Sequence, residues 1–367
     1  MRKVLLVGDY PPPYGGLSVQ IAALRGRLAA LDDTEVRVLD IGTRRRERRP
    51  DCVPVAGPVD FAQKLLTHAG RGFAVHGHTN GHNVKSWIVA LACAAAGLAT
   101  GRRSLISLGS GLMPAFLGAA SGRVRALART TVRTAGALVV RNEACRAALL
   151  ALGAPANAVR ILPGFYGVTE SEIGRLPYGA ARFRRGHRPV VGAIASHGAE
   201  YGLALLLDAA ARLKPRYPEL GVLLVGPDRM EDGHPDWVLP IGELDRPALL
   251  ASVRALDVFV RPTYFDGDAS SVREALAMGV RVVASDTDFR PAGVRVFPRG
   301  DADALADAIE KSLIESPVTI DSTSLPDLLA LYDALPLRSE TPRRVRRPHP
   351  VTGSAAAPRV DESKKVA

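Results

Sequence analysis

Two carboxylates near position 270 are the residues best suited by type and spacing to do chemistry. Asp266 and Glu274 are separated by seven residues, between an apolar run that ends at residue 260 and another that begins at residue 280. This pattern predicts a strand, an acidic loop, a helix and a second strand. At the amino end of such a helix, unpaired backbone N–H groups and the helix dipole favour an anion such as a phosphate. The same turn contains three further residues that could contact that anion: Ser270, Ser271 and Arg273.

Glu274 also fits a purely structural role. Ser271 lies three residues before it, which is the spacing of a capping box, in which the two side chains accept hydrogen bonds from free backbone N–H groups. On this interpretation Glu274 stabilises the helix. The two roles are compatible, because a capped helix amino end can still face a bound phosphate.

A second strand-to-helix loop lies near the amino terminus. The apolar run at residues 3–7 leads into a loop rich in proline and glycine that ends at Gly15 and Gly16, and apolar residues at helical spacing follow from Leu17 to Leu31. Glycines at this point would let the backbone approach a phosphate, although an ordinary turn would use them equally well.

Three histidines, His76, His78 and His82, follow a short apolar run and suggest a zinc site. No acidic or cysteine residue follows nearby to complete a ligand set. We therefore expect no metal here, but a loop that lines one side of a binding cleft.

The elements that must position these residues alternate between strands and helices along the chain, and the alternation restarts near residue 189 after a stretch without a clear period. This is typical of α/β domains with parallel sheets, so we expect two doubly wound, Rossmann-like domains that face a central cleft. The expected boundaries are a first domain at 1–165, a linker at 166–188, a second domain at 189–320, a last helix at 321–335 and a disordered basic tail at 336–367.

With these motifs the chain resembles the retaining glycosyltransferases of family 4, which have the two-domain GT-B fold. Their signature is an acidic residue, seven intervening residues and a glutamate, followed by an Ala-Met-Gly turn and a strand that ends in Ala-Ser; residues 277–279 and 282–285 match this continuation. The resemblance implies that Glu274 holds the ribose of a nucleotide and that Asp266 lies near the donor sugar. It also implies that Gly15 and Gly16 approach the donor phosphates.

The resemblance covers about residues 2–335 and assigns a role to each domain. The second domain would bind the nucleotide sugar, the first would bind the acceptor, and the last helix would cross back to the first domain. In the family a histidine often lies near the sugar, in a loop that here reads Ser-Leu-Gly-Ser-Gly at 107–111. Because this loop has no histidine, His78 or Asn80 would serve instead.

One departure from the family concerns the donor diphosphate. After the first strand of the second domain, the family carries an arginine and, a few residues later, a lysine that grip the diphosphate. The corresponding segment here is 195–202, where neither cation is present and Tyr201 takes the place of the lysine. Since charge on the leaving diphosphate must be stabilised, His197, Arg261 and Arg273 are the candidates to replace the missing cations, and Tyr201 and His197 are expected to contact the donor.

The function implied by the resemblance is transfer of a sugar from a nucleotide-activated donor to a saccharide or lipid-linked acceptor with retained configuration, in the synthesis of cell-surface polysaccharide or glycolipid. No cofactor is expected, because the nucleotide sugar is itself a substrate. The missing cations favour one alternative, a catalytically inactive scaffold of the same fold that binds a nucleotide sugar or a partner protein. A second alternative is a nucleotide-sugar epimerase of related fold.

Composition limits the remaining classes. The 367 residues are 47% hydrophobic, which excludes wholesale disorder and suits two domains. Three cysteines without a C-x-x-C spacing argue against a disulfide scaffold, and the longest apolar run, at residues 87–99, is too short to span a bilayer. We therefore expect a cytoplasmic protein.

The net charge of +11 is concentrated in two segments. Residues 336–367 contain eight basic and three acidic residues, and residues 44–49 contain five arginines. Aromatic residues make up only 5% of the chain and do not interleave with these segments, so we expect no nucleic acid partner. An anionic membrane surface is the partner that the charge favours.

Overall fold

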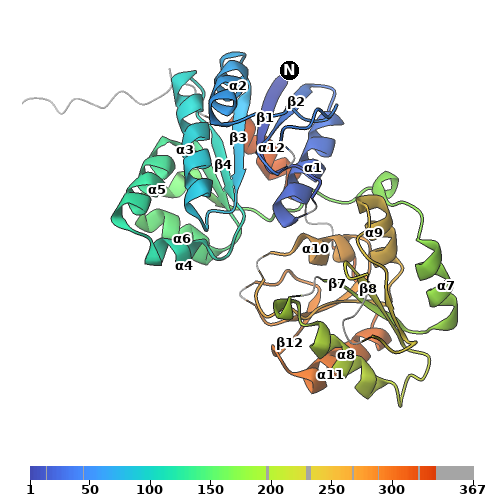
Figure 1. Cartoon of the computed structure of the whole chain (residues 1–367). Helices are drawn as coiled ribbons and strands as arrows, with labels where there is room; N and C mark the ends of the chain where they lie inside the picture. Colours follow the sequence, from blue (N-terminus) through green and yellow to red (C-terminus); the bar gives the residue numbers. More distant parts are fainter. Residues whose placement is uncertain are drawn as a thin grey trace, which may run out of the picture.

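The computed structural model describes residues 1–13, 15–43, 45–195, 198–228, 233–266, 268–287, 289–320 and 323–335. Three of the sequence predictions fall outside these ranges: those for Arg44, for His197 and for the basic segment 336–367. The described residues form two α/β domains, one above the other in Figure 1, and each domain is built on a parallel sheet of six strands. The prediction of two doubly wound domains is thus confirmed.

The first sheet has the strand order β2-β1-β3-β4-β5-β6. Its strands are β1 (Arg2–Gly8), β2 (Thr34–Asp40), β3 (Ala74–Thr79), β4 (Leu105–Leu108), β5 (Ala137–Val140) and β6 (Val159–Ile161). One face is covered by α1 (Gly16–Ala29) and α12 (Leu325–Asp333), and the other by α2 (Pro58–Gly70), α3 (Val84–Ala99), α4 (Met113–Ala119), α5 (Gly122–Thr134) and α6 (Glu143–Ala151). A single 3-10 turn, η1 (Ala156–Ala158), precedes β6.

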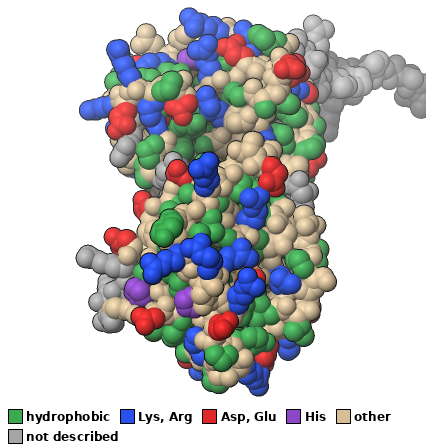
Figure 2. Space-filling model, turned by 90° about the vertical axis from the view of Figure 1, so that its right-hand side faces the viewer, with side chains coloured by type: hydrophobic (Ala, Val, Ile, Leu, Met, Phe, Trp, Pro, Cys, Tyr) green, Lys and Arg blue, Asp and Glu red, His purple; other side chains and the backbone are tan. Residues whose placement is uncertain are grey.

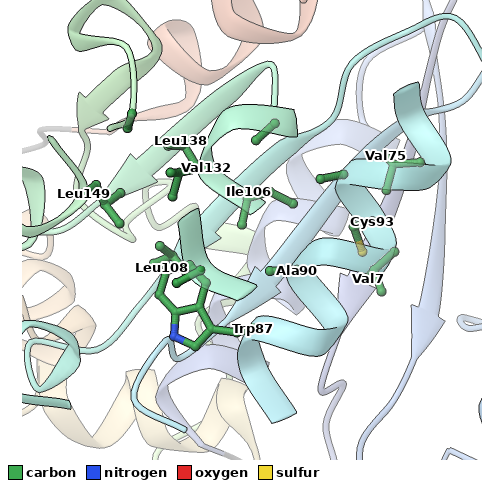
Figure 3. Close-up of a cluster of buried hydrophobic side chains, with 14 of the residues drawn as sticks. Val7, Val75, Trp87, Ala90, Cys93, Ile106, Leu108, Val132, Leu138 and Leu149 are labelled. Atoms are coloured by element: carbon green, nitrogen blue, oxygen red, sulfur yellow. The ribbon is translucent and has the colours of Figure 1, made fainter. Parts of the chain in front are cut away.

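A continuous apolar core fixes this sheet against its helices. Trp87 and Cys93 of α3 are fully buried and pack with Ile106 and Leu108 of β4 (Figure 3). All three cysteines of the chain, Cys52, Cys93 and Cys145, are buried. The inner strands β1 and β5 are apolar on both sides over Val4–Val7 and Ala137–Val140, because helices cover both faces of the sheet.

The second sheet has the order β12-β11-β10-β7-β8-β9. Its strands are β7 (Val190–Ile194), β8 (Gly221–Val225), β9 (Val238–Pro240), β10 (Val258–Arg261), β11 (Arg281–Ser285) and β12 (Val294–Phe297). Helices α8 (Leu203–Leu213) and α11 (Ala302–Ile314) pack on one face, and α7 (Tyr178–Gly186), α9 (Arg246–Arg254) and α10 (Ser270–Ala277) on the other.

The segment 166–188, expected as a linker, is only partly one. It contains the 3-10 turn η2 (Glu170–Glu172) and helix α7, whose Ala180 is buried in the core of the second domain with Val190 and Leu223. The second domain therefore begins before residue 189. The sequence did not predict this helix because its buried side, with Ala180 and Phe183, is short and is interrupted by arginines.

Helix α12 lies on the first domain (Figure 1), where Leu328 and Tyr332 join the core. The buried Tyr332 hydroxyl is 2.6 Å from His76 Nδ1, and Asp333 pairs with Arg2 at 2.8 Å. The chain thus crosses between the domains twice. None of the helices in the described ranges is long and apolar enough to cross a membrane.

Candidate functional site

A cleft of about 1250 Å³ lies between the two domains. Its lining residues follow β1, β3 and β4 of the first sheet and β7, β8 and β10 of the second. In both sheets the strand order reverses at this point, between β1 and β3 and between β7 and β10, which is where open α/β sheets bind ligands. The volume exceeds the 300–1,000 Å³ typical of a single small ligand, so two reactants fit.

The amino end of α1 forms part of the first-domain wall. Gly15 and Gly16 line the cleft, as the glycine-rich loop suggested. Gly15 is the N-cap of α1 in an extended conformation, and its N–H donates to Ser18 Oγ at 2.9 Å. The helix dipole at this end of α1 favours an anion in the cleft.

His78, by contrast, does not reach the cleft. It lies in β3 with 1% of its surface exposed, and its ring is 3.8 Å from that of His76. Residues two apart in a strand point to the same face, so His78 shares the face that α12 covers. Burial, reinforced by the charge of Arg141, lowers the pKa of His78 to about 3. The residue from this segment that lines the cleft is Asn80, in the loop after the strand.

Helix α10 forms the opposite wall, where Ser270, Ser271 and Glu274 all line the cleft. The N-cap of this helix is Ala269, with no side-chain hydrogen bond. Ser271 is already inside the helix, so the capping box that its spacing suggested does not form. Among the described residues no side chain caps the amino end of α10, which lines the cleft, and the Glu274 carboxylate has no capping role.

Glu274 instead forms a buried ion pair with α9. The residue is 6% exposed, and its Oε1 accepts a hydrogen bond from Arg246 Nη1 at 2.8 Å. Burial raises the pKa of Glu274, and the opposing charge of Arg246 offsets this only in part. The carboxylate is thus a strong acceptor in a nearly dry environment.

Asp266 lines the cleft in the loop after β10 and is held by two arginines. Its Oδ2 accepts hydrogen bonds from Arg261 Nε at 3.0 Å and Arg290 Nη1 at 2.9 Å. Burial would raise the pKa of Asp266, but the two guanidinium groups outweigh burial and lower it. The side chain is therefore a fixed negative charge at neutral pH.

Arg273, expected as the cation nearest to a phosphate, is not among the cleft residues. Its Nε donates to Asp268 Oδ1 at 2.6 Å, and its guanidinium carbon lies 5.7 Å from the centre of the Phe289 ring. Adjacent helix residues point about 100° apart, so Glu274 can face the cleft while Arg273 faces a loop. The arginines that do line the cleft are Arg246, Arg261 and Arg299.

Arg261 is one of the sequence candidates to replace the missing cations, whereas sequence reasoning missed Arg246 and Arg299. Arg261 is the last residue of β10, at the carboxyl edge of the sheet, and Arg246 directly follows the N-cap Asp245 of α9. Both positions face a cleft in this type of sheet. Arg299 lies in the loop after β12 and offered no comparable signal.

Tyr201 lines the cleft at the end of the 3-10 turn η3 (Ala199–Tyr201). The next residue, Gly202, has φ +68°, and a Cβ there would come within 2.1 Å of the Pro262 carbonyl oxygen. Glycine thus lets this turn contact the loop after β10. The close approach places Arg261 over the Tyr201 ring, with the guanidinium carbon 5.8 Å from the ring centre.

The two walls also contact each other directly. Gln20 of α1 donates from Nε2 to Ser270 Oγ at 3.1 Å, and its Oε1 accepts from Arg141 Nη2 at 2.9 Å. The amino ends of α1 and α10 are thus joined across the cleft. Within the described residues, no group of three or more His, Cys, Asp and Glu side chains is arranged to hold a metal ion.

Comparisons with known proteins agree with this arrangement. Residues 188–315 match the family model of glycosyl transferases group 1. A phosphatidyl-myo-inositol mannosyltransferase from Mycolicibacterium smegmatis is 33% identical over 126 residues, which are 29% of this chain and 31% of that protein. The matched part therefore spans less than a third of the relative's length.

Solved structures resemble the whole chain at low sequence identity. Anabaena HepE, in complex with UDP and glucose, has a TM-score of 0.61 at 18% identity and covers 86% of this chain and 90% of its own. Sucrose-phosphate synthase from Thermosynechococcus elongatus has a TM-score of 0.61 at 19% identity, covering 90% and 95%. UDP-GlcNAc 2-epimerase from Methanocaldococcus jannaschii has a TM-score of 0.59 at 9% identity, covering 91% and 99%. The chain has the two-domain GT-B fold, and its second domain matches the glycosyl transferases group 1.

Proposed function

We propose that this protein is a glycosyltransferase that moves a sugar from a nucleotide-activated donor to a saccharide or lipid-linked acceptor, with retention at the anomeric carbon. The observation that carries the proposal is Glu274, a buried carboxylate in the cleft next to the uncapped amino end of α10. The match of residues 188–315 to glycosyl transferases group 1, which includes this helix, supports it. So does the likeness to a mannosyltransferase over part of the chain.

Each wall of the cleft has a role in the proposed reaction. Glu274 accepts hydrogen bonds from the ribose hydroxyls, and the amino ends of α1 and α10 stabilise the diphosphate. As the bond from the sugar C1 to the diphosphate breaks, its electron pair leaves with the phosphate oxygen, and Asp266 balances the positive charge that develops on the ring. The acceptor oxygen bonds to C1 from the side of Asn80, and its hydroxyl proton passes to the oxygen of the departing diphosphate. No cofactor takes part.

Fold similarity alone does not separate this proposal from its alternatives, because the epimerase has almost the same TM-score as the synthase. The family match of the second domain favours a transferase over an epimerase. The buried, charged groups at the cleft favour binding of a polar ligand such as a nucleotide sugar, and transfer of the sugar is what would distinguish the enzyme from the inactive scaffold.

Nucleotide binding is the first test. UDP, GDP and ADP, each at 100 times its dissociation constant, would stabilise the folded state by about 2.7 kcal/mol if bound only there. We expect at least one of them to raise the melting temperature in a thermal-shift assay, and its sugar conjugate to be consumed when a glycan or lipid acceptor is added. If none of them stabilises the protein, the donor site does not exist. Binding without sugar transfer would support the scaffold alternative.

We propose further that the acceptor is reached at an anionic membrane surface on the cytoplasmic side. The expected cluster at 44–49 contributes less than its sequence suggests, because Arg49 is 15% exposed and pairs with the buried Asp40. Arg46 and Arg48 are exposed. A larger basic surface of the first domain is α5, where Arg123, Arg125, Arg129 and Arg133 are all exposed. On the second domain, Lys and Arg side chains gather on the side that carries α7 (Figure 2), whose Arg182, Arg184 and Arg185 are exposed.

Vesicle binding tests this surface. Each basic residue near an anionic bilayer contributes about 1 kcal/mol, so several must act together. We expect the intact protein to sediment with vesicles that contain phosphatidylglycerol, but not with pure phosphatidylcholine, and to be released at high salt. Changing the four α5 arginines to serine should remove more binding than the pair Arg46→Ser and Arg48→Ser. Sedimentation that ignores lipid charge would contradict the membrane proposal.

A further inference from the structure

The segment after β7, residues 195–202, contains no lysine or arginine at the point where the donor diphosphate would lie. Ala195 and Tyr201 line the cleft there, and neither carries a charge. A diphosphate that departs from a sugar gains negative charge, and enzymes stabilise this charge with fixed donors or cations. Another part of the cleft must supply them.

Arg261 brings a cation to this place from a neighbouring strand. It ends β10, which pairs with β7 in the sheet, and it lines the cleft. Its guanidinium carbon lies 5.8 Å from the centre of the Tyr201 ring, within the range of a cation–π contact. Tyr201, which stands where the family has a lysine, therefore has the cation of Arg261 over its ring.

The hydrogen bonds of Arg261 leave donors available. Its Nε donates to Asp266 and one Nη1 hydrogen donates to the Ile194 carbonyl oxygen at 3.2 Å. A guanidinium has five N–H donors, so three have no partner among the residues that the structure describes. Arg290 differs, because all three of its nitrogens donate to Asp266, Ser285 or Thr263 and it is not part of the cleft lining.

The charge balance around Asp266 also favours an anionic ligand. This one carboxylate accepts hydrogen bonds from both Arg261 and Arg290, so the buried group of three side chains carries a net positive charge. A buried charge without a partner of opposite sign lowers the stability of the fold unless a ligand supplies the opposite charge. A diphosphate in the cleft would supply it.

We propose that Arg261 is the cation that binds the donor diphosphate, in place of the basic residues missing after β7, and that Tyr201 holds its guanidinium in position. This inference rests on the proposed function, since it concerns the same nucleotide-sugar site. The ligand chemistry is a nucleoside diphosphate, bound through the N–H groups of Arg261 that point away from Asp266.

Binding of UDP, GDP and ADP and of the matching nucleosides, measured by calorimetry, tests the proposal. For Arg261→Gln we expect the dissociation constant of the diphosphate that binds wild-type protein to rise about 10- to 100-fold, while that of the nucleoside changes less than twofold. Arg254→Gln is the matched control, because Arg254 pairs with Glu170 on the surface; we expect it to change neither value.

Two further variants distinguish the loss of the diphosphate contact from a folding defect in Arg261→Gln. Tyr201→Leu leaves both arginines on Asp266 and should weaken diphosphate binding by about 2- to 10-fold through loss of the ring contact. Adding Tyr201→Lys to Arg261→Gln restores a cation at the same place and should recover at least part of the lost affinity. If Arg261→Gln and Tyr201→Leu both bind diphosphate as tightly as the wild type, the assignment to Arg261 is wrong and the proposed function stands. If wild-type protein binds no nucleoside diphosphate, both fail.

Discussion

A Glu274→Gln variant is expected to lose nearly all sugar transfer and to bind nucleotide about 10- to 100-fold more weakly. The physical reason is that a buried carboxylate next to the helix end accepts hydrogen bonds from ribose hydroxyls more strongly than an amide does. Gln keeps the size of the side chain and one acceptor for Arg246, so the fold should survive. Nucleotide affinity by calorimetry and initial transfer rates are the measurements.

The matched control is Ser271→Ala. A helix cap is worth about 0.5–2 kcal/mol, and if Ser271 and Glu274 formed a capping box, Ser271→Ala would lower the free energy of unfolding by that amount, whereas Glu274→Gln would keep the box. Because the N-cap is Ala269, we expect Ser271→Ala to leave urea denaturation nearly unchanged. Normal nucleotide affinity in Glu274→Gln, with lowered stability in Ser271→Ala, would restore the capping role and remove the proposed one.

The raised pKa of Glu274 adds a pH signature to this prediction. Its pKa in the folded protein lies above the unfolded value, so the stability contributed by this group is present at low pH and is lost as the pH rises through the folded pKa. Nucleotide binding should change in the opposite direction, because the ribose needs the charged form. We expect affinity to fall as acid protonates Glu274, and this dependence to weaken in Glu274→Gln.

The sequence was sufficient to predict the sheets, the loop that carries Asp266 and the helix that carries Glu274, because strand-to-helix alternation and short motifs are local properties. It could not tell which side of a helix or strand faces the cleft. Arg273 and Glu274 are neighbours, yet only Glu274 lines the cleft. His78 and Asn80 are only two residues apart, yet Asn80 lines the cleft and His78 is buried under α12. These outcomes depend on packing between segments far apart in the chain.

The sequence could not predict the ion pairs of the arginines at the cleft for the same reason. Arg246 meets Glu274 from another helix, 28 positions away, and Arg290 meets Asp266 from 24 positions away. Spacing rules reach only three or four residues along a helix. The sequence therefore did not show that two arginines hold the Asp266 carboxylate.

An Asp266→Asn variant should lose stability as well as transfer. The Asp266 side chain is 10% exposed and pairs with Arg261 and Arg290, which are 15% and 5% exposed. Removing its charge leaves two guanidinium groups close together without a counter-ion, and breaking a buried pair in this way costs about 3–5 kcal/mol. Urea denaturation of the wild type and the variant would measure the loss.

Asp286→Asn is the control that separates burial from charge. Asp286 pairs with Arg299 at 3.3 Å, but it is 52% exposed, so its loss should cost less than about 1 kcal/mol. The pKa of Asp266 is lower in the folded protein than in the unfolded chain. The stability that this carboxylate contributes is therefore present at neutral pH and is lost as the pH falls through the folded pKa. The difference between wild type and Asp266→Asn should therefore shrink in acid. Equal losses in the two variants, or a difference that persists at low pH, would mean that Asp266 does not hold the two arginines as a charged group.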